Sequence, residues 1–400
     1  MTNNKTLLFV TWDSDQTNYL ESLFLPILRG MQEQGGYSCH VMQFSWADGQ
    51  EVSRIARLAG DMGLPYVQYP IYRKPTAAVG ALWTVYQGMY YIRKYLEKYG
   101  IGLLMPRSTM PAMMVNRLWP WLVSNNIRVV FDADGLPLQE RVDFAGLDTQ
   151  SAQYQLLKKE ETRMLVSAHQ VITRSQRSID FHIENIGESH RPKFSVVGNG
   201  RDSRLFRPDE EERKRIRDKW GLGNADMLWV YTGTLGPQYM VEEMLAMFER
   251  FRKMQPGTRF LILSQNVDYL KGRIPESLEP YLMIKSGKYS DVPGYLSAAD
   301  LGMSLRRTAP SLAGLAPIKL GEYLLMGLPV LASEGVGDTE ELLKGQDFCF
   351  LFDSGRQKEF LSWCEKGTNW NREKIRAFGI EHFSLQKSVE GYLGRMEGRL

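Results

Sequence analysis

The sequence has 400 residues, 43% of them hydrophobic and 11% aromatic, and a formal net charge of +3. This composition excludes a disordered chain, and so small a net charge gives no general attraction to nucleic acid. The three cysteines show neither disulfide nor metal-ligand spacing, which favours a reducing compartment, and we expect a cytoplasmic protein. The first residues lack the pattern of a signal peptide, and no apolar stretch is long enough to predict a membrane span.

Short apolar runs alternate with longer helical patterns, which predicts βαβ units and parallel sheets. In the first half the expected strands are residues 7–11, 38–44, 66–69, 102–105, 128–131 and 170–173, with helices over 19–34, 81–99 and 152–167. In the second half the expected strands are 227–231, 259–263, 282–284, 301–305, 329–331 and 348–352, with helices over 241–253 and 319–326.

This alternation restarts after residue 200. The segment SVVGNGRDSRLFRP (residues 195–208) holds two glycines and an asparagine, which are typical of a turn or hinge. We therefore predict two doubly wound α/β domains, Rossmann-like in each case, over residues 1–200 and 201–384. Such domains would face each other across a cleft, with ligands at the carboxyl ends of the strands.

The most informative segment is TAPSLAGLAPIKLGEYLLMGLPVLASEGVGD (residues 308–338). It predicts a loop, a helix opening at Pro317, a glycine turn and a strand, because proline is favoured at the first helical position. Small residues before the helix, such as Gly314 and Ala316, allow a ligand to approach the backbone. The free N–H groups at a helix start form an anion site.

Lys319 and Glu322 are three residues apart and therefore share one side of this helix. A lysine there can pair with a phosphate, and a glutamate can accept hydrogen bonds from the two hydroxyls of a ribose. The alternative that the local pattern leaves open is a surface helix with an ordinary Lys–Glu pair.

The string PIKLGEYLLMGLPVLAS resembles the donor-binding signature of the retaining family-four glycosyltransferases, the "group 1" transferases of polysaccharide and glycoconjugate synthesis. Three more segments are similar to that family in the same order: VVGNGRDSRLFRP, WVYTGTLGPQYMVEEMLAMF (residues 229–248) and SDVPGYLSAADLGMSL (residues 290–305). The resemblance implies the GT-B fold. It also implies transfer of a hexose-type unit, with retention, from a nucleoside diphosphate sugar to a glycan or lipid-linked acceptor.

The resemblance also implies site residues. Glu322 would bind the donor ribose, Lys319 the sugar or diphosphate, and Tyr289 the nucleobase, while the first domain would bind the acceptor. The full set expected at the donor is Gly233, Thr234, Tyr289, Arg306, Arg307, Ser311, Leu315, Ala316, Ile318, Lys319 and Glu322. The last helix, about 385–400, is expected to pack on the first domain. No metal or other cofactor is expected.

The sequence departs from the family at three positions. Gly314 stands where the family has the first of two glutamates, Thr234 replaces a common arginine, and a nearby lysine is missing. Arg306 and Arg307 are candidates to neutralise the leaving diphosphate instead, although a solvated loop pair is an equal alternative. Two other functions stay open: a nucleotide-sugar 2-epimerase, which uses the same two-domain fold, and a non-catalytic nucleotide-sugar-binding subunit, which the lost basic groups make plausible.

FDADGL (residues 131–136) follows an apolar strand, so Asp132 and Asp134 are expected at its carboxyl end. We predict that they bind acceptor hydroxyls and assist deprotonation, acting with Lys319 and Glu322 as the catalytic set. A loop or helix-cap role is the alternative, and a metal-binding aspartate pair is disfavoured. Asp13 and Asn18 are weaker candidates for the acceptor side.

Residues 72–100 begin with basic residues and contain many aromatic ones. One interpretation is a helix that makes a peripheral contact with the inner face of a membrane. The favoured interpretation is a buried helix face formed by Trp83, Tyr86, Met89, Tyr90 and Ile92, whose spacing also fits a core.

Overall fold

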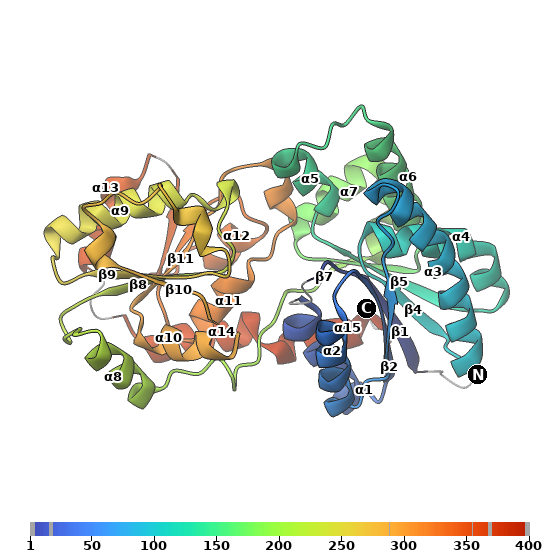
Figure 1. Cartoon of the computed structure of the whole chain (residues 1–400), viewed down its shortest axis with the longest axis horizontal. Coiled ribbons are helices and arrows are strands. Elements are labelled where there is room, and N and C mark those ends of the chain that lie inside the picture. The colour runs from blue at the N-terminus through green and yellow to red at the C-terminus, as the bar shows by residue number, and fades with distance from the viewer. Residues whose placement is uncertain (1–4, 16–18, 288, 354, 367–369, 397–400) are drawn as a thin grey trace. The chain divides into compact units, whose positions relative to one another are not determined.

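A computed structural model describes residues 5–15, 19–287, 289–353, 355–366 and 370–396. The chain divides into two compact units (Figure 1). Unit 1 comprises Met1–Gly198, Pro310–Leu315 and Ser388–Leu400, and unit 2 comprises Asn199–Ala309 and Ala316–Lys387. The first change of unit, after Gly198, falls within the glycine-rich segment 195–208.

Unit 1 is built on a sheet of seven parallel strands in the order β3-β2-β1-β4-β5-β6-β7. The strands are β1 Thr6–Trp12, β2 Ser38–Ser45, β3 Tyr66–Pro70, β4 Leu103–Pro106, β5 Arg128–Asp134, β6 Gln170–Thr173 and β7 Phe194–Val196. The order reverses beside β1, and at such a switch point ligands gather at the carboxyl ends of the strands.

The helices of unit 1 lie on both faces of this sheet (Figure 1). They are η1 Leu20–Phe24, α1 Leu25–Gly35, α2 Gly49–Asp61, α3 Ala77–Tyr99, α4 Thr109–Ser124, α5 Pro137–Ala145, α6 Ala152–Ser167, α7 Gln176–Ile186, η2 Glu188–Lys193, η7 Pro310–Gly314 and α15 Leu385–Met396. Because helices cover both faces, central strands such as β1 carry apolar residues on both sides rather than alternating with polar ones.

Unit 2 is built on six parallel strands in the order β10-β9-β8-β11-β12-β13. The strands are β8 Leu228–Thr232, β9 Arg259–Leu263, β10 Leu282–Lys285, β11 Leu301–Ser304, β12 Val330–Ser333 and β13 Cys349–Phe352. The α-helices are α8 Glu210–Lys219, α9 Val241–Met254, α10 Val292–Ala298, α11 Ile318–Leu325, α12 Thr339–Leu343, α13 Gln357–Lys366 and α14 Arg372–Phe383. Short helices η3 Pro237–Tyr239, η4 Val267–Leu270, η5 Glu279–Tyr281 and η6 Tyr289–Asp291 connect them.

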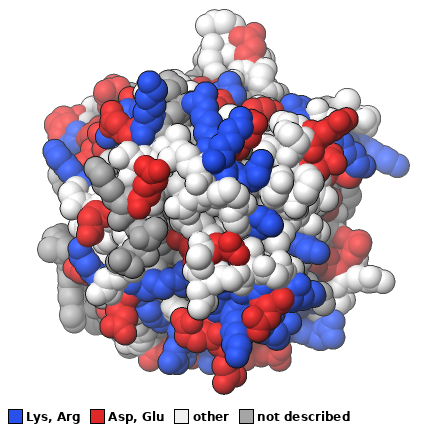
Figure 2. All heavy atoms as spheres, turned by 90° about the vertical axis from the view of Figure 1, so that its left-hand side faces the viewer, with Lys and Arg blue, Asp and Glu red and all other residues white. Residues whose placement is uncertain are grey.

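The charged side chains of unit 2 are mixed in sign. Figure 2 shows Lys and Arg interspersed with Asp and Glu on one face of the molecule. The exposed helices pair them locally, as in Arg215 with Glu212 on α8 and Lys253 with Glu249 on α9. Such pairs between exposed charges add little stability but produce a solvated surface without a field of one sign.

The predicted α/β architecture is confirmed, with two sheets of parallel strands. Each strand that the sequence predicts is present within a few residues of its expected bounds. Within the part of the chain that the structure describes, the prediction missed only β7, a strand of three residues. The helix predicted from Pro317 begins one residue later. Pro317 occupies the N-cap, with an extended ψ of 114°, because the chain arrives there in a loop and turns into the helix only at Ile318.

The interpretation of the α3 aromatic residues as one buried face is wrong. Ile92 is buried and Met89 half-buried, but Trp83, Tyr86 and Tyr90 are exposed. The reason is that α3 buries its other side, which carries glycines and Thr84, against the rest of unit 1.

Across the described residues, none of the helices has the length and apolarity needed to cross a membrane.

Candidate functional site

The helix α11 carries the strongest site candidates, and Tyr323 fixes its position in unit 2. The Tyr323 hydroxyl accepts a hydrogen bond from the backbone N–H of Thr232 at the end of β8, at 2.8 Å. Its ring packs on Gly302 of β11 so closely that a Cβ there would lie 2.4 Å from a ring carbon. The first turn of α11 is therefore held at the carboxyl end of the sheet of unit 2, where ligands bind in doubly wound folds.

Lys319, in that first turn, faces aromatic rings rather than a carboxylate. Its Nζ lies 3.9 Å from the ring centroid of Tyr231 and 4.8 Å from that of Tyr239. A Cβ at Gly233, whose φ is +114°, would lie 3.4 Å from the same Nζ. Burial, and next the nearby charge of Arg306, hold the pKa of Lys319 well below its ordinary value, and Glu322 opposes this only in part.

The structure separates the two arginines that the sequence could not distinguish. The Arg306 guanidinium lies 4.5 Å from the ring centroid of Tyr239, beside Lys319. Its Nη1 is buried and has no hydrogen-bond partner among the described residues. Arg307 instead donates from Nε to the carbonyl of Pro237 and from its backbone N–H to that of Gln238. Arg306 therefore belongs to the Lys319 cluster, whereas Arg307 braces the loop before α9.

Glu322, one turn after Lys319, is buried and paired with a residue that the sequence analysis missed. Arg201 donates from Nε to Oε1 of Glu322 at 3.1 Å, and both side chains are less than 10% exposed. Burial raises the pKa of Glu322, although Arg201 and Lys319 oppose the shift. Arg201 lies in the segment VVGNGRDSRLFRP, so that motif was the available signal. Its guanidinium also lies 5.4 Å from the ring centroid of Tyr289, the residue predicted at the nucleobase.

The loop after β8 is held rigidly beside this cluster. The carbonyl of Thr234 accepts a hydrogen bond from the Tyr231 hydroxyl at 2.5 Å. Asn266 accepts the backbone N–H of Leu235 and donates to its carbonyl, at 2.9 and 2.8 Å. Gly233 and Thr234 are thus held in place without contributing a charge.

The predicted donor residues do not all belong to one unit. Ala316, Ile318, Lys319 and Glu322 lie in unit 2, whereas Ser311 and Leu315 lie in unit 1. In unit 1 the backbone N–H of Ser311 donates to Asp143 at 2.8 Å. A Cβ at Gly314 would lie 2.5 Å from the backbone nitrogen of Leu136 and 2.9 Å from the carbonyl carbon of Gly135. This explains why glycine occupies position 314, where the resembling family has a glutamate.

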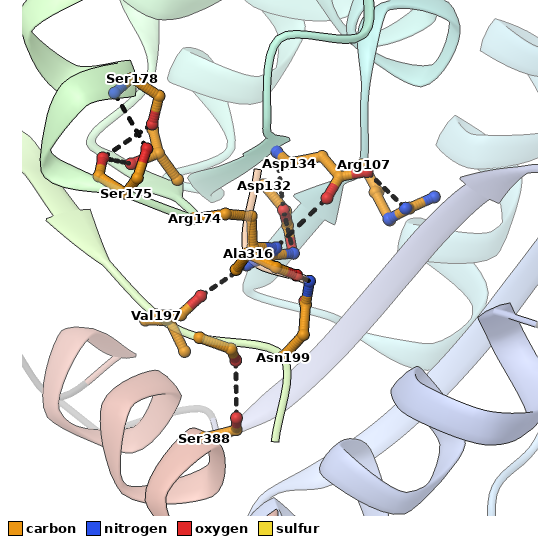
Figure 3. Close-up of polar contacts among 12 residues, drawn as sticks. Arg107, Asp132, Asp134, Arg174, Ser175, Ser178, Val197, Asn199, Ala316 and Ser388 are labelled. Atoms are coloured by element: carbon orange, nitrogen blue, oxygen red, sulfur yellow. Dashed lines mark hydrogen bonds and ion pairs between the residues drawn. The ribbon is translucent and has the colours of Figure 1, made fainter. Parts of the chain in front are cut away.

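A second polar cluster lies in unit 1 at the carboxyl ends of β4, β5 and β6 (Figure 3). Asp132 is fully buried, and Arg174 donates to both of its carboxylate oxygens at 2.7 and 2.8 Å. The Tyr392 hydroxyl of α15 donates to Oδ2 of Asp132 at 2.6 Å. These bonds occupy the Asp132 carboxylate, so its geometry favours a role in holding Arg174 and α15. The contact of Asp132 with an acceptor stays a prediction.

Asp134, unlike Asp132, is partly exposed. Its Oδ2 accepts from Arg107 at 2.5 Å and its Oδ1 from Arg174 at 3.2 Å. Burial acts to raise the pKa of Asp134, but Arg107 and Arg174 outweigh it and hold the pKa below its ordinary value. Its φ of +63° is uncommon for a residue other than glycine and marks a constrained backbone. Asp134 is therefore an ionised hydrogen-bond acceptor at the edge of the cluster.

Asp13, at the end of β1, forms a separate network. It accepts a hydrogen bond from Nε2 of Gln43 at 2.7 Å, and the Tyr66 hydroxyl donates to Oε1 of the same glutamine at 2.6 Å. Burial raises the pKa of Asp13 despite the opposing charge of Arg107. Asn18, the other candidate on this side, lies outside the described residues.

Replacing Tyr392 with phenylalanine tests whether the Asp132–Arg174 pair fastens α15 to unit 1. The change removes one buried hydrogen bond to a charged group, and we expect a loss of about 1.5–3 kcal/mol in the free energy of unfolding. Urea denaturation measures it, with Tyr99→Phe, at an exposed tyrosine, as the matched control. Equal stability of both variants would show that the contact contributes nothing.

Among the described residues, no group of three or more His, Cys, Asp or Glu side chains could hold a metal ion.

Two doubly wound parallel sheets in one chain, with the last helix counted in the first unit, define the GT-B fold of glycosyltransferases. Among solved structures, HepE of Anabaena in complex with UDP and glucose matches with a TM-score of 0.69 and 16% identity, covering 99% of this chain and 100% of that one. A glycosyltransferase from Rickettsia africae matches with a TM-score of 0.71 and 13% identity, covering 99% of both chains. UDP-GlcNAc 2-epimerase from Neisseria meningitidis matches with a TM-score of 0.62 and 12% identity, covering 98% of this chain and 100% of that one.

At these identities the likeness shows the fold. No protein-family model matches the chain, and no curated protein sequence matches it.

Proposed function

We propose that the chain is a retaining glycosyltransferase that takes a hexose-type sugar from a nucleoside diphosphate sugar bound in unit 2. The acceptor is a glycan or a lipid-linked glycan, so the reaction belongs to polysaccharide or glycoconjugate synthesis. The fold, the order of the four resembling segments and the Lys319 cluster together support this assignment.

The observation that carries the proposal is a pair of cations without a matching pair of anions. Lys319 and Arg306 both lie within 5 Å of the Tyr239 ring centroid, and the charge of Arg306 disfavours the charged form of Lys319. The buried Arg306 Nη1 lacks a partner among the described residues. Bringing like charges together without a counter-ion costs free energy, and a diphosphate bound there would recover it. The same cations would stabilise the charge that develops on the leaving nucleotide.

The Glu322–Arg201 pair supports the rest of the donor assignment. Arg201 occupies Oε1 of Glu322 and orients the carboxylate, leaving Oε2 to accept hydrogen bonds from ribose hydroxyls. Solved structures of HepE of Anabaena contain UDP, UDP with glucose, or UDP-glucose. Uridine nucleotides are therefore the first to test.

The acceptor side of the proposal rests on unit 1. Asp134 and Asp13 each have a partly exposed carboxylate at the end of a strand, in position to accept a hydrogen bond from an attacking hydroxyl. With retention, the leaving phosphate can take the proton, so neither residue needs to be a strong base. The reaction requires no metal in this proposal, and the enzyme works in the cytoplasm.

A nucleotide panel followed by a turnover assay tests this function. We expect UDP, or failing that GDP, dTDP or CMP, to raise the melting temperature, because ligand binding to the native state stabilises it by mass action. We expect release of the nucleoside diphosphate from the matching nucleotide sugar only when a glycan or lipid extract supplies acceptor. Conversion of the sugar without acceptor would identify an epimerase. A thermal shift without turnover would identify a binding subunit.

A further inference from the structure

The helix α3 buries several small residues and exposes large aromatic ones, unlike an ordinary surface helix. The side that faces the protein carries small residues, including Gly80, Thr84 and Gly88. A Cβ at Gly80 would lie 2.3 Å from the carbonyl oxygen of Tyr72, and one at Gly88 would lie 2.5 Å from Sδ of Met114 on α4. Packing this close leaves no room for a larger side chain at Gly80 or Gly88. The aliphatic residues Val85, Ile92 and Leu96 are also buried, whereas the aromatic residues Trp83, Tyr86 and Tyr90 are exposed.

The outer side of α3 forms an aromatic stripe. Trp83, Tyr86 and Tyr90 are 57%, 61% and 54% exposed, and Val79 and Leu82 continue the stripe towards the start of the helix. Spacings of three and four residues place these side chains on one face. From Ala77 to Ile92 the helix carries no charged residue. A contiguous exposed apolar patch on a protein surface marks a binding surface, because its contact with water is unfavourable and a partner that covers it removes that contact.

The charge around the stripe is strongly positive. Residues 72–100, which include α3, contain five Lys or Arg residues and one acidic residue, Glu97, whereas the whole chain has a net charge of only +3. Arg73 and Lys74 precede the helix and are exposed. Lys94 follows the stripe, and its Nζ lies 4.5 Å from the ring centroid of Tyr90. The aromatic stripe therefore lies between two exposed basic groups.

We propose that this face of α3 binds the surface of a membrane that contains anionic lipids. Trp and Tyr rings are favoured at the level of the headgroups, where their apolar bodies and polar tips are both satisfied. Arg73, Lys74 and Lys94 contact lipid phosphates, which add attraction for each cation. The helix lies flat on the membrane, because its inner side remains packed on α4. This surface lies outside the donor site and brings unit 1, the proposed acceptor unit, to a lipid-linked substrate.

Two other partners, a second copy of the chain and nucleic acid, fit this face less well. A second copy of the chain would bring the same basic groups against each other. Nucleic acid would be bound by the cations, but the continuous stripe of Val79, Leu82 and Trp83 offers apolar side chains without a cation among them.

Flotation of the full chain with lipid vesicles tests the proposal. We expect binding to phosphatidylcholine vesicles that contain phosphatidylglycerol, and weak binding to phosphatidylcholine alone. Trp83→Ser/Tyr86→Ser should reduce the partition coefficient about tenfold or more, because two large apolar side chains no longer leave water. Lys94→Gln should reduce it about fivefold at low salt and less at high salt. The control is Leu205→Ser/Ile380→Ser, at two exposed apolar residues of unit 2, which should bind as the original chain does.

Three outcomes would overturn the proposal. The first is equal binding by the Trp83→Ser/Tyr86→Ser variant, and the second is no preference for anionic vesicles. The third is a dimer in sedimentation velocity that this variant dissociates, which would make the face a subunit interface. The side chains are exposed, so the variant should keep the unfolding curve and the nucleotide-dependent thermal shift of the original chain. Failure of flotation with that shift intact would reject the membrane surface alone, not the proposed transferase.

Discussion

Lys319→Met is expected to lower nucleotide-sugar turnover, kcat/KM, about 100- to 1000-fold, the range found when one group that stabilises developing negative charge is removed. Methionine keeps much of the length of the side chain and can pack between the rings of Tyr231 and Tyr239, so the fold should persist. The loss should appear in nucleoside diphosphate binding as well as in kcat, because the same ammonium group holds the diphosphate before and after transfer.

The free energy of unfolding of Lys319→Met should rise, although its turnover and nucleotide binding fall. In the native state burial and Arg306 lower the pKa of Lys319, whereas in the unfolded chain it returns to its ordinary value of 10.5. Between these two values the unfolded state binds more protons, so stability from this group rises with pH over that window. Below the window the native lysine is a charge held at a cost, and Lys319→Met should be the more stable chain. This advantage should shrink as the pH rises towards 10.5.

Urea denaturation across this pH range and isothermal calorimetry with UDP measure the two effects. Lys271→Met is the matched control, because the Lys271 side chain is 80% exposed and pairs with Asp268, three residues earlier. It should change neither binding nor the pH dependence. If Lys319→Met bound the nucleotide as tightly as the original chain, Lys319 would have no place in the donor site.

Glu322→Gln is expected to weaken nucleoside diphosphate binding about tenfold to a hundredfold. The change removes the negative charge that ribose hydroxyls and Arg201 share, and a hydrogen bond to a charged group contributes about 1.5–3 kcal/mol. The same change removes the counter-charge that Glu322 supplies to the buried Arg201, and complete loss of one partner of such a pair costs about 3–5 kcal/mol. Glutamine is therefore a better test than alanine, because its amide oxygen can still accept from Arg201 Nε.

A double variant separates the two effects of Glu322. In Arg201→Gln/Glu322→Gln both charges are gone, so we expect much of the lost stability to return. Nucleotide binding should not return with it, because the carboxylate is still absent. Glu249→Gln, at a surface Glu–Lys pair on α9, serves as the control and should leave both quantities unchanged. Recovery of binding in the double variant would mean that Glu322 acts only by holding Arg201.

The sequence predicted the sheets and α11 because their signals are local. Apolar runs such as FLIL in β9 and the string PIKLGEY keep their meaning whatever packs around them. The pairing of Arg201 with Glu322 joins residues that are 121 positions apart, and no spacing rule connects them. The contacts of Arg174 and Asp132 with Tyr392 span still longer separations, 218 and 260 positions. Both clusters can be recognised only in the folded structure, where the strand order brings their elements together.

The outward stripe of α3 escaped prediction for a different reason. Helical periodicity shows that Trp83, Tyr86 and Tyr90 share a face, but it does not show which face is buried. Large aromatic residues usually lie on the buried face. In α3 the face that carries Gly80 and Gly88 is buried instead, because only that face allows the close contact with α4 and with residues 72–73.

The sequence also did not predict that residues 310–315 belong to unit 1. The string from Ser311 to Glu322 looks like one continuous motif, yet it changes unit between Leu315 and Ala316. Gly314 needs its small size for the backbone at Gly135 rather than for a ligand.

A crystal structure with bound UDP tests the central claim most directly. The account predicts the β-phosphate within hydrogen-bond distance of Lys319 Nζ, next to Gly233, with the ribose hydroxyls on the Glu322 carboxylate. Density for the nucleotide at any place away from the first turn of α11 would contradict it.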